Sequence, residues 1–199
     1  MESRKVSSLS VKSDGSDSSL KVGNNLILEK IGEIALGEVA APRSLTAAGA
    51  FICLLAGETH VFLSEVKVRA DSDCTAVRRA LLALPGIKEE KRYLDAALFQ
   101  VTPSDYRLAV LGERKNKERF VAVVEVVSSG RVLGLGEEMS MYDKASMLGK
   151  GLSHIAAFPG GQNGEADLLT FSNIVRKLHV EEAGASLKPT SGRVQGRNS

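Results

Sequence analysis

The chain contains no tryptophan and few other aromatic residues, and this scarcity limits both its core and its functions. Phenylalanine and tyrosine together make up 5% of the 199 residues. A surface on which nucleic-acid bases stack requires several exposed aromatic side chains. We do not expect a chain with so few aromatic residues to form such a surface, because the core also needs them. The hydrophobic fraction of 43% is still high enough for a packed core. That core must therefore consist mainly of Ala, Val, Leu and Ile.

Cysteines and long apolar runs are scarce as well. The two cysteines, Cys53 and Cys74, have no CxxC spacing and stand in or beside apolar stretches, which predicts buried free thiols in a reducing compartment. The N-terminus lacks the apolar stretch of a signal peptide, and the longest nearly uncharged segment, 45–57, is shorter than the ~18 residues that a membrane-spanning helix requires. We therefore expect a cytoplasmic protein that is neither secreted nor transmembrane and that could attach peripherally to a membrane.

No catalytic signature is present. The three histidines, His60, His154 and His179, lie in no nucleophile elbow such as GxSxG, and no His or Cys pair has the spacing of metal ligands. The glycines of segment 130–136 match neither common phosphate-binding pattern, and Glu137 and Glu138 would repel a phosphate there. The sequence thus predicts a non-enzymatic protein without metal or cofactor. A small enzyme or ligand-binding domain whose site is not visible in the sequence is an alternative.

Charge is distributed unevenly along the chain. The formal net charge is +2, yet segment 183–199 carries three basic residues and no acid, and segment 1–21 has a small basic excess. The body between them is mildly acidic. Both end segments are polar and lack apolar periodicity, which predicts disordered tails over 1–21 and 183–199 around a single domain, 22–182. A polyanion or an anionic membrane would meet the tails first.

Segment 113–119 is the best interaction candidate inside the domain, with four basic and two acidic residues. Such a run between strands is also typical of a solvated turn. Basic groups without aromatic partners contact phosphates or lipid headgroups with little sequence specificity. The candidate contact residues for a polyanion or a membrane are Arg4, Lys5, Lys12, Arg114, Lys115, Lys117, Arg119, Lys188, Arg193 and Arg197.

The apolar pattern predicts an α+β fold: a single domain, mainly an antiparallel β-sheet with two to three packed α-helices. Apolar or alternating runs joined by short connections predict strands over 45–56, 60–70, 93–101, 106–111, 120–127 and 131–135. Helical spacing predicts helices over 74–84, over 140–151 and around 168–178. Segment 25–39 fits either a helix or a strand.

The first of these helices has the clearest signals. Its apolar residues, Ala76, Val77, Ala80, Leu81 and Leu84, recur at helical spacing, and Arg78 and Arg79 then face outward. Asp71, Ser72 and Asp73 offer N-caps, and the Pro85-Gly86 pair would end the helix.

Two stretches resemble the matrix proteins of rhabdoviruses. His60–Leu84 (HVFLSEVKVRADSDCTAVRRALLAL) is similar to the strand and helix that open the family's core, and Met141–His154 (MYDKASMLGKGLSH) is similar to its second helix. The Pro-Pro-x-Tyr budding motif is absent. The resemblance implies a viral structural protein of the virion and host cytoplasm that self-associates and links the nucleocapsid to the membrane. The implied partners are a second copy of the chain, viral nucleoprotein or RNA, and an anionic membrane surface.

Two other stretches resemble plant-virus movement proteins of the thirty-kilodalton type. They are Leu98–Tyr106 (LFQVTPSDY) and Phe120–Glu138 (FVAVVEVVSSGRVLGLGEE). This second resemblance implies binding of single-stranded nucleic acid for transport. One antiparallel sheet backed by helices over 74–84 and 140–151 would support the matrix resemblance, whereas a jelly-roll sandwich would support the movement-protein resemblance.

Overall fold

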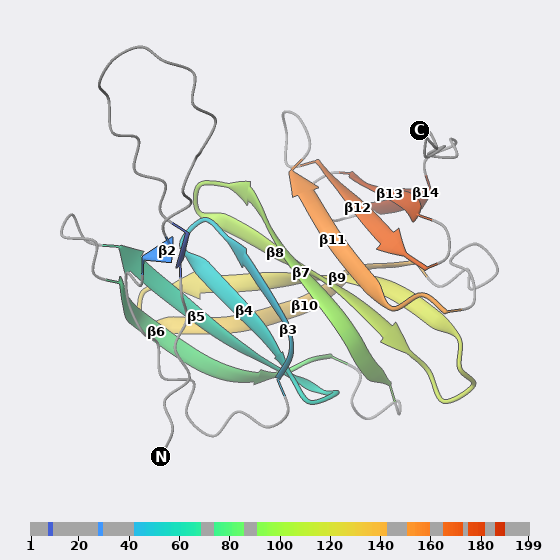
Figure 1. The fold of residues 1–199 in the computed structure, drawn as a ribbon, viewed down its shortest axis with the longest axis horizontal. Helices are drawn as coiled ribbons and strands as arrows, with labels where there is room; N and C mark the ends of the chain where they lie inside the picture. Colours follow the sequence, from blue (N-terminus) through green and yellow to red (C-terminus); the bar gives the residue numbers. More distant parts are fainter. Residues whose placement is uncertain are drawn as a thin grey trace, which may run out of the picture.

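The computed structural model describes residues 8–9, 28–29, 42–68, 74–85, 91–142, 151–159, 165–172, 175–181 and 186–189 (Figure 1). Every regular element within these ranges is a β-strand, and none is a helix. The predicted α+β class is therefore wrong, and the described part of the chain is all-β.

The described strands form three four-stranded sheets and one two-stranded pair. Sheet 1 contains β3 (Pro42–Ala48), β4 (Phe51–Ala56), β5 (His60–Val68) and β6 (Cys74–Ala83). Sheet 2 contains β7 (Arg92–Thr102), β8 (Asp105–Glu113), β9 (Arg119–Ser129) and β10 (Val132–Tyr142). Sheet 3 contains β11 (His154–Pro159), β12 (Ala166–Phe171), β13 (Val175–Glu181) and β14 (Ser186–Pro189). The separate pair consists of β1 (Ser8–Leu9) and β2 (Leu28–Glu29).

Each four-stranded sheet is an antiparallel meander in which every strand pairs with the next one along the chain. The predicted strands over 60–70, 93–101, 106–111, 120–127 and 131–135 are confirmed in position by β5 and β7 to β10. The predicted run 45–56 is two strands, because the chain turns at Gly49, whose φ of 52° is left-handed. Glycine adopts such a φ without steric cost.

The first predicted helix, 74–84, is strand β6. Ala76 and Ala80 share one face of a helix, but residues an even number apart also share one face of a strand. β6 pairs with β5 along its whole length, and Leu81 is 56% exposed although a helix would bury it. Arg78, expected to face outward, has a side chain only 20% exposed and forms an ion pair with Glu65. The expected caps at 71–73 lie outside the described residues.

The other two predicted helices are wrong wherever the chain is described. Ser140 and Met141, expected to open a helix, belong to the end of β10, and residues 143–150 lie outside the described ranges. Leu168 and Leu178, expected on one helical face, sit opposite each other on β12 and β13 and are both buried. A hairpin places these two residues directly opposite each other, whereas a helix would only align them along one face, about 15 Å apart. Of segment 25–39, only Leu28–Glu29 is described, and it is a strand.

Sheet 2 is the middle layer (Figure 1), and buried apolar side chains lie on both of its faces. Along β9, Ala122 and Val124 belong to the apolar cluster shared with sheet 1, whereas Val121 and Val123 belong to the cluster shared with sheet 3. Successive side chains of a strand point to opposite faces. An unbroken apolar run such as 120–124 therefore suits a strand that is covered on both sides.

Aliphatic side chains make up most of both clusters, as the composition predicts. The few aromatic rings in the cluster between sheets 1 and 2 form edge-to-face pairs. The ring centroids of Phe51 and Tyr106 are 4.6 Å apart, and those of Tyr93 and Phe120 are 5.9 Å apart. These rings are buried, so they form part of the core and offer no stacking platform.

Polar contacts join sheet 1 to sheet 2 at two opposite edges. The hydroxyl oxygen of Thr46 on β3 accepts a hydrogen bond of 3.0 Å from the backbone N–H of Leu98 on β7. At the other edge, Arg78 on β6 donates to the carbonyl oxygens of Gly130 and Val132 at 2.9 and 3.0 Å. The two sheets are therefore fixed relative to each other by hydrogen bonds as well as by apolar packing.

The end segments are described only in part. β1 lies within the expected N-terminal tail, 1–21, and β14 lies beyond the expected domain boundary at residue 182. Among the residues that the structure describes, there is no helix with the length and apolar character needed to cross a membrane.

Candidate polyanion-contact site

Four of the ten predicted contact residues come together at one end of sheet 2. Arg114, Lys115 and Lys117 lie in the β8–β9 loop, and Arg119 begins β9. Lys188 lies on β14 of sheet 3, where its Nζ is 2.6 Å from a carboxylate oxygen of Glu181. The remaining predicted residues, Arg4, Lys5, Lys12, Arg193 and Arg197, lie outside the described residues.

The β8–β9 loop is held in shape by its own backbone. The N–H of Arg114 donates to the carbonyl oxygen of Glu118, and the N–H of Lys117 donates to that of Arg114, both at 2.9 Å. Asn116 accepts a further hydrogen bond of 3.1 Å from the N–H of Glu118 through its side-chain oxygen. Lys117 adopts a left-handed φ of 67°. The basic side chains thus project from a compact turn.

Glu113, at the end of β8, organises the cations around it. Arg92 and Arg119 lie directly opposite Glu113 on the two neighbouring strands. Nε of Arg92 donates to Oε1 at 2.7 Å, Nη2 of Arg119 lies 2.8 Å from Oε2, and Nζ of Lys117 lies 3.5 Å from Oε1. Burial by itself would raise the pKa of Glu113, but the hydrogen bond from Arg92 and the charges of Arg119, Arg92 and Lys117 outweigh it and lower that pKa.

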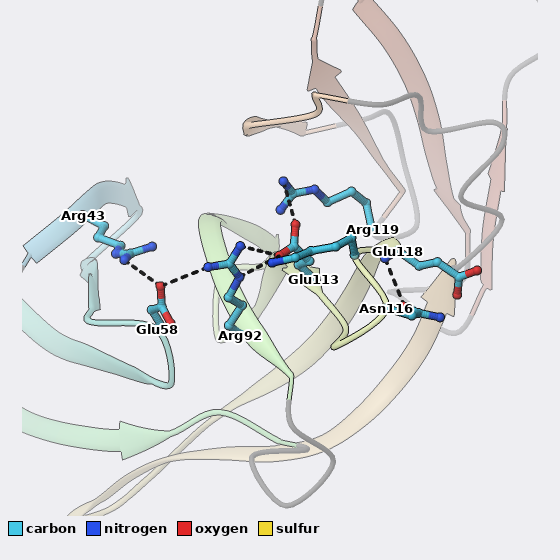
Figure 2. A network of polar contacts seen from close by, with 8 residues as sticks. Arg43, Glu58, Arg92, Glu113, Asn116, Glu118 and Arg119 are labelled. Carbon is cyan, nitrogen blue, oxygen red and sulfur yellow. Dashed lines mark hydrogen bonds and ion pairs between the residues drawn. The ribbon is translucent and has the colours of Figure 1, made fainter.

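A second carboxylate extends the network to sheet 1 (Figure 2). Glu58 lies in the β4–β5 turn, and its carbonyl oxygen accepts a hydrogen bond of 2.7 Å from the N–H of Tyr93 on β7. Its side-chain Oε1 is 2.8 Å from Nη2 of Arg43 and 3.7 Å from Nη1 of Arg92. Charges therefore alternate along the row Arg43, Glu58, Arg92, Glu113 and Arg119.

Two further cations pack on a buried ring beneath this network. The Nζ of Lys91 lies 5.5 Å from the centroid of the Phe120 ring, and the guanidinium carbon of Arg114 lies 5.7 Å from it. Phe120 is fully buried. The ring faces two positive charges, an arrangement that contributes a favourable cation–π interaction.

Seven basic and three acidic side chains gather here, and we call this set the basic end. The basic members are Arg43, Lys91, Arg92, Arg114, Lys115, Lys117 and Arg119, and the acidic ones are Glu58, Glu113 and Glu118. The adjoining segment 86–90 adds one Lys and two Glu by sequence, so the surplus remains positive. A surface of this kind attracts anions.

The sequence indicates the loop residues of the basic end but not Arg43, Lys91 and Arg92. These residues lie at or just before the starts of β3 and β7, and no spacing rule relates the starts of strands in two different sheets. The sequence feature that could have pointed to Arg92 is the alternation of charge at the strand ends, in Arg92, Glu113 and Arg119. Opposite charges on neighbouring strands are typical cross-strand pairs, so this signal requires the strand order.

Each of the three histidines has a polar contact outside the basic end, and the acid beside His179, Asp167, also forms an ion pair of 2.7 Å with Lys177. Nδ1 of His154 is 3.3 Å from Asp95, and Nδ1 of His179 is 3.1 Å from Asp167. His60 contacts the neighbouring hydroxyl of Thr59 at 2.8 Å. Within the described ranges, no three His, Cys, Asp or Glu side chains are grouped in a way that could hold a metal ion.

Cys53 is a buried free thiol, as predicted. Burial raises its pKa to about 12, and a thiol becomes a nucleophile only when it is deprotonated. Cys53 therefore belongs to the core between sheets 1 and 2. The side chain of Cys74 lies outside the described part of the structure.

Comparison of the chain with protein-family models and with curated proteins finds no match.

Proposed function

We propose that this chain is a non-enzymatic interaction protein that contacts polyanions through the basic end and works by assembly, as a matrix-like protein would. One observation carries this proposal: the fold gathers basic side chains from β3, β7 and the β8–β9 loop at one place. The three acidic members of the basic end, Glu58, Glu113 and Glu118, only partly offset the positive charge of the seven basic ones. In the proposal, the self-association and the link between nucleocapsid and membrane remain those that the matrix resemblance implies.

The chemistry of the basic end favours phosphates over bases. Four of its seven cations are arginines, whose planar guanidinium groups bind phosphate oxygens through two parallel hydrogen bonds. Its aromatic ring, Phe120, is buried and is therefore not free to stack on a base. Binding of this kind depends on the backbone of a nucleic acid rather than on its sequence.

The fold supports neither viral resemblance over the other, and segment 74–84, which the matrix resemblance takes as a helix, is strand β6. The described sheets are meanders of consecutive strands, which is neither a single sheet backed by helices nor a jelly roll. A transport protein that binds single-stranded nucleic acid therefore remains the second candidate. The basic end favours it as much as it favours a matrix-like protein, and the difference between the two lies in membrane binding.

The test measures binding of the full chain to a uridine-only RNA and to phosphatidylserine-containing liposomes over a series of salt concentrations. We expect binding that weakens steeply as salt rises, because each phosphate contact releases a counterion. Binding to both probes supports the matrix-like function, and binding to RNA alone supports the transport function. Binding to neither probe at low salt would overturn the proposal.

A charge-matched pair of variants locates the contact. Replacing Lys115 and Lys117 by Gln removes two exposed charges from the basic end. Replacing Lys67 and Arg131 by Gln removes two exposed charges far from it, because Lys67 lies near the end of β5 and Arg131 lies in the β9–β10 turn. We expect weaker binding for the first pair only. Equal losses in both pairs would show that net charge alone acts.

Self-association is tested separately. A matrix-like protein should form oligomers whose size increases with concentration in sedimentation velocity experiments. A chain that stays monomeric at high concentration and low salt would contradict the matrix-like function and leave the transport function.

A further inference from the structure

Two arginines from different sheets converge on a single oxygen atom at the basic end (Figure 2). Arg43 lies on β3 of sheet 1, and Arg92 lies on β7 of sheet 2. Both approach Oε1 of Glu58, Arg43 through Nη2 at 2.8 Å and Arg92 through Nη1 at 3.7 Å. The contact between Arg92 and Glu58 is therefore an ion pair that is too long for a hydrogen bond.

The guanidinium of Arg92 is held in its orientation by Glu113, on the side away from Glu58. Its Nε donates to Oε1 of the buried Glu113 at 2.7 Å, and its Nη2 binds the same oxygen. These two contacts leave Nη1 directed at the Glu58 carboxylate. An arginine whose other donors are fixed in this way loses less rotational freedom when it binds an anion.

The three side chains can be reached from solvent. The exposed fractions are 40% for Arg43, 41% for Arg92 and 37% for Glu58. An ion pair this exposed contributes little to the stability of a fold, so an anionic ligand can displace the Glu58 carboxylate at low cost. The Glu58 carboxylate therefore lies in an anion-binding position between two guanidinium groups, and these groups bind it weakly.

We propose that Arg43 and Arg92 bind one phosphate of a nucleic-acid strand, in the position that the carboxylate of Glu58 takes in the unbound protein. This inference rests on the proposed polyanion-binding function and names the subsite and the ligand class. A phosphodiester carries one negative charge shared by two oxygens, so it can accept hydrogen bonds from both guanidinium groups at once. Glu58 then acts as a competitor built into the site.

A nucleic acid fits this site better than a membrane does. Proteins that bind at a membrane interface insert apolar side chains beside their basic ones. In the described residues of β3, β7, β8 and β9, one large apolar side chain, Leu45, is strongly exposed. A single leucine provides little apolar area, whereas a phosphate backbone requires none.

The test compares two charge-matched pairs of variants in binding a uridine-only RNA. Arg43→Gln removes a cation from the subsite, and Arg131→Gln removes an exposed cation from the far end of sheet 2. We expect Arg43→Gln to weaken binding roughly fivefold and to lower the slope of log affinity against log salt by about one. Arg131→Gln should leave affinity within about twofold of the unmodified chain.

The second pair tests the competitor. Glu58→Gln and Glu118→Gln each remove one acid from the basic end, and Glu118 has no contact with Arg43 or Arg92 among the hydrogen bonds and ion pairs of the described residues. We expect Glu58→Gln to tighten RNA binding several-fold more than Glu118→Gln does, because it alone removes the carboxylate that faces Arg43 and Nη1 of Arg92. Circular dichroism and the melting temperature verify that each variant is folded.

The possible outcomes separate this inference from the proposed function. If RNA binding is salt-dependent but the two members of each pair behave alike, the subsite is wrong and the general function stands. If the unmodified chain binds neither RNA nor liposomes, both fail. If phosphatidylserine liposomes bind and RNA does not, and Arg43→Gln abolishes liposome binding, the nucleic-acid ligand is overturned in favour of a lipid headgroup.

Discussion

Glu113 is a buried acid on which three cations converge, and its titration links the basic end to the stability of the fold. Its pKa is lower in the folded chain than the value of 4.5 for an ordinary glutamate. A carboxylate with a lowered folded-state pKa stabilises the fold above its unfolded pKa, and this contribution is lost as the pH falls through the folded-state pKa. The stabilisation by Glu113 is thus complete at neutral pH and disappears in acid.

The substitution Glu113→Gln should lower the free energy of unfolding at pH 7 by about 2–4 kcal/mol, because it leaves Arg92 and Arg119 without their buried partner. Urea unfolding followed by circular dichroism measures this loss. The difference from the unmodified chain should shrink as the pH falls below about 4.5. Glu118→Gln, which changes an exposed acid of the same loop, should cost no more than about 0.5 kcal/mol. A loss of stability on Glu113→Gln substitution that is the same at pH 7 and in acid would contradict the role given to Glu113.

Gly112 is required because the ring of Phe120 lies against its backbone. A Cβ atom at this position would lie 2.2 Å from Cζ of the ring. Gly112→Ala should therefore lower the free energy of unfolding by about 1–3 kcal/mol through overpacking, as measured by urea unfolding. Gly134→Ala is the control, because a Cβ there meets nothing within 4 Å. Combining Gly112→Ala with Phe120→Leu should recover part of the loss, and equal effects of the two glycine substitutions would contradict this packing.

The sequence revealed part of the basic end at the scale of single residues. Arg114, Lys115, Lys117 and Arg119 could be found because they are neighbours in the chain. Arg43 could not, because its approach to Glu58 depends on how sheet 1 packs against sheet 2. The burial of Glu113 was also hidden, since an acid within a charged run gives no sign that it is enclosed.

At the scale of elements, β6 shows why apolar spacing alone can predict a helix where the chain forms a strand. The apolar spacing of four in 74–84 fits both a helix and one face of a strand. What decides between them is a neighbour: β5 supplies backbone partners for β6 from Val68 back to His60. Strands whose apolar residues simply alternate, such as β5, were predictable because alternation excludes a helix.

The two states of segment 74–84 bury different leucines, which gives a direct test. In strand β6, Leu81 is 56% exposed, and Leu82 packs against the core between sheets 1 and 2. Leu81→Lys should change the free energy of unfolding by less than about 1 kcal/mol, whereas Leu82→Lys should cost about 2 kcal/mol, because it replaces partly buried apolar packing with a charge. Chemical denaturation measures both. The opposite order would indicate the helix.

At the scale of the whole molecule, the three-layer arrangement was the least predictable feature. The run 120–124 indicates a strand covered on both faces, but nothing in it says which sheets provide the cover. The described strands nearest in sequence on either side of sheet 2, β6 and β11, belong to the two covering sheets. The order of layers therefore follows the order of the chain, with the middle third of the domain in the middle.

A pair of valines tests the two buried faces of sheet 2. Val124 faces sheet 1 and Val123 faces sheet 3, and neither is exposed. Substitution of either by Ala should lower the free energy of unfolding by about 1–3 kcal/mol, as measured by urea unfolding. Val132→Ala, at a side chain that is 59% exposed, should have an effect near zero. A negligible cost at Val123 would mean that sheet 3 does not cover this face.

The meander topology also sets the order in which the layers become available during synthesis. Sheet 1 leaves the ribosome first and can cover one face of sheet 2 as that sheet emerges, because both sheets are complete once Tyr142 has been made. The opposite face, with Phe99, Leu111 and Val121, has no cover until the strands of sheet 3 follow. A released chain that is truncated between residues 142 and 154 would therefore display an apolar face of the kind that chaperones bind and that promotes aggregation.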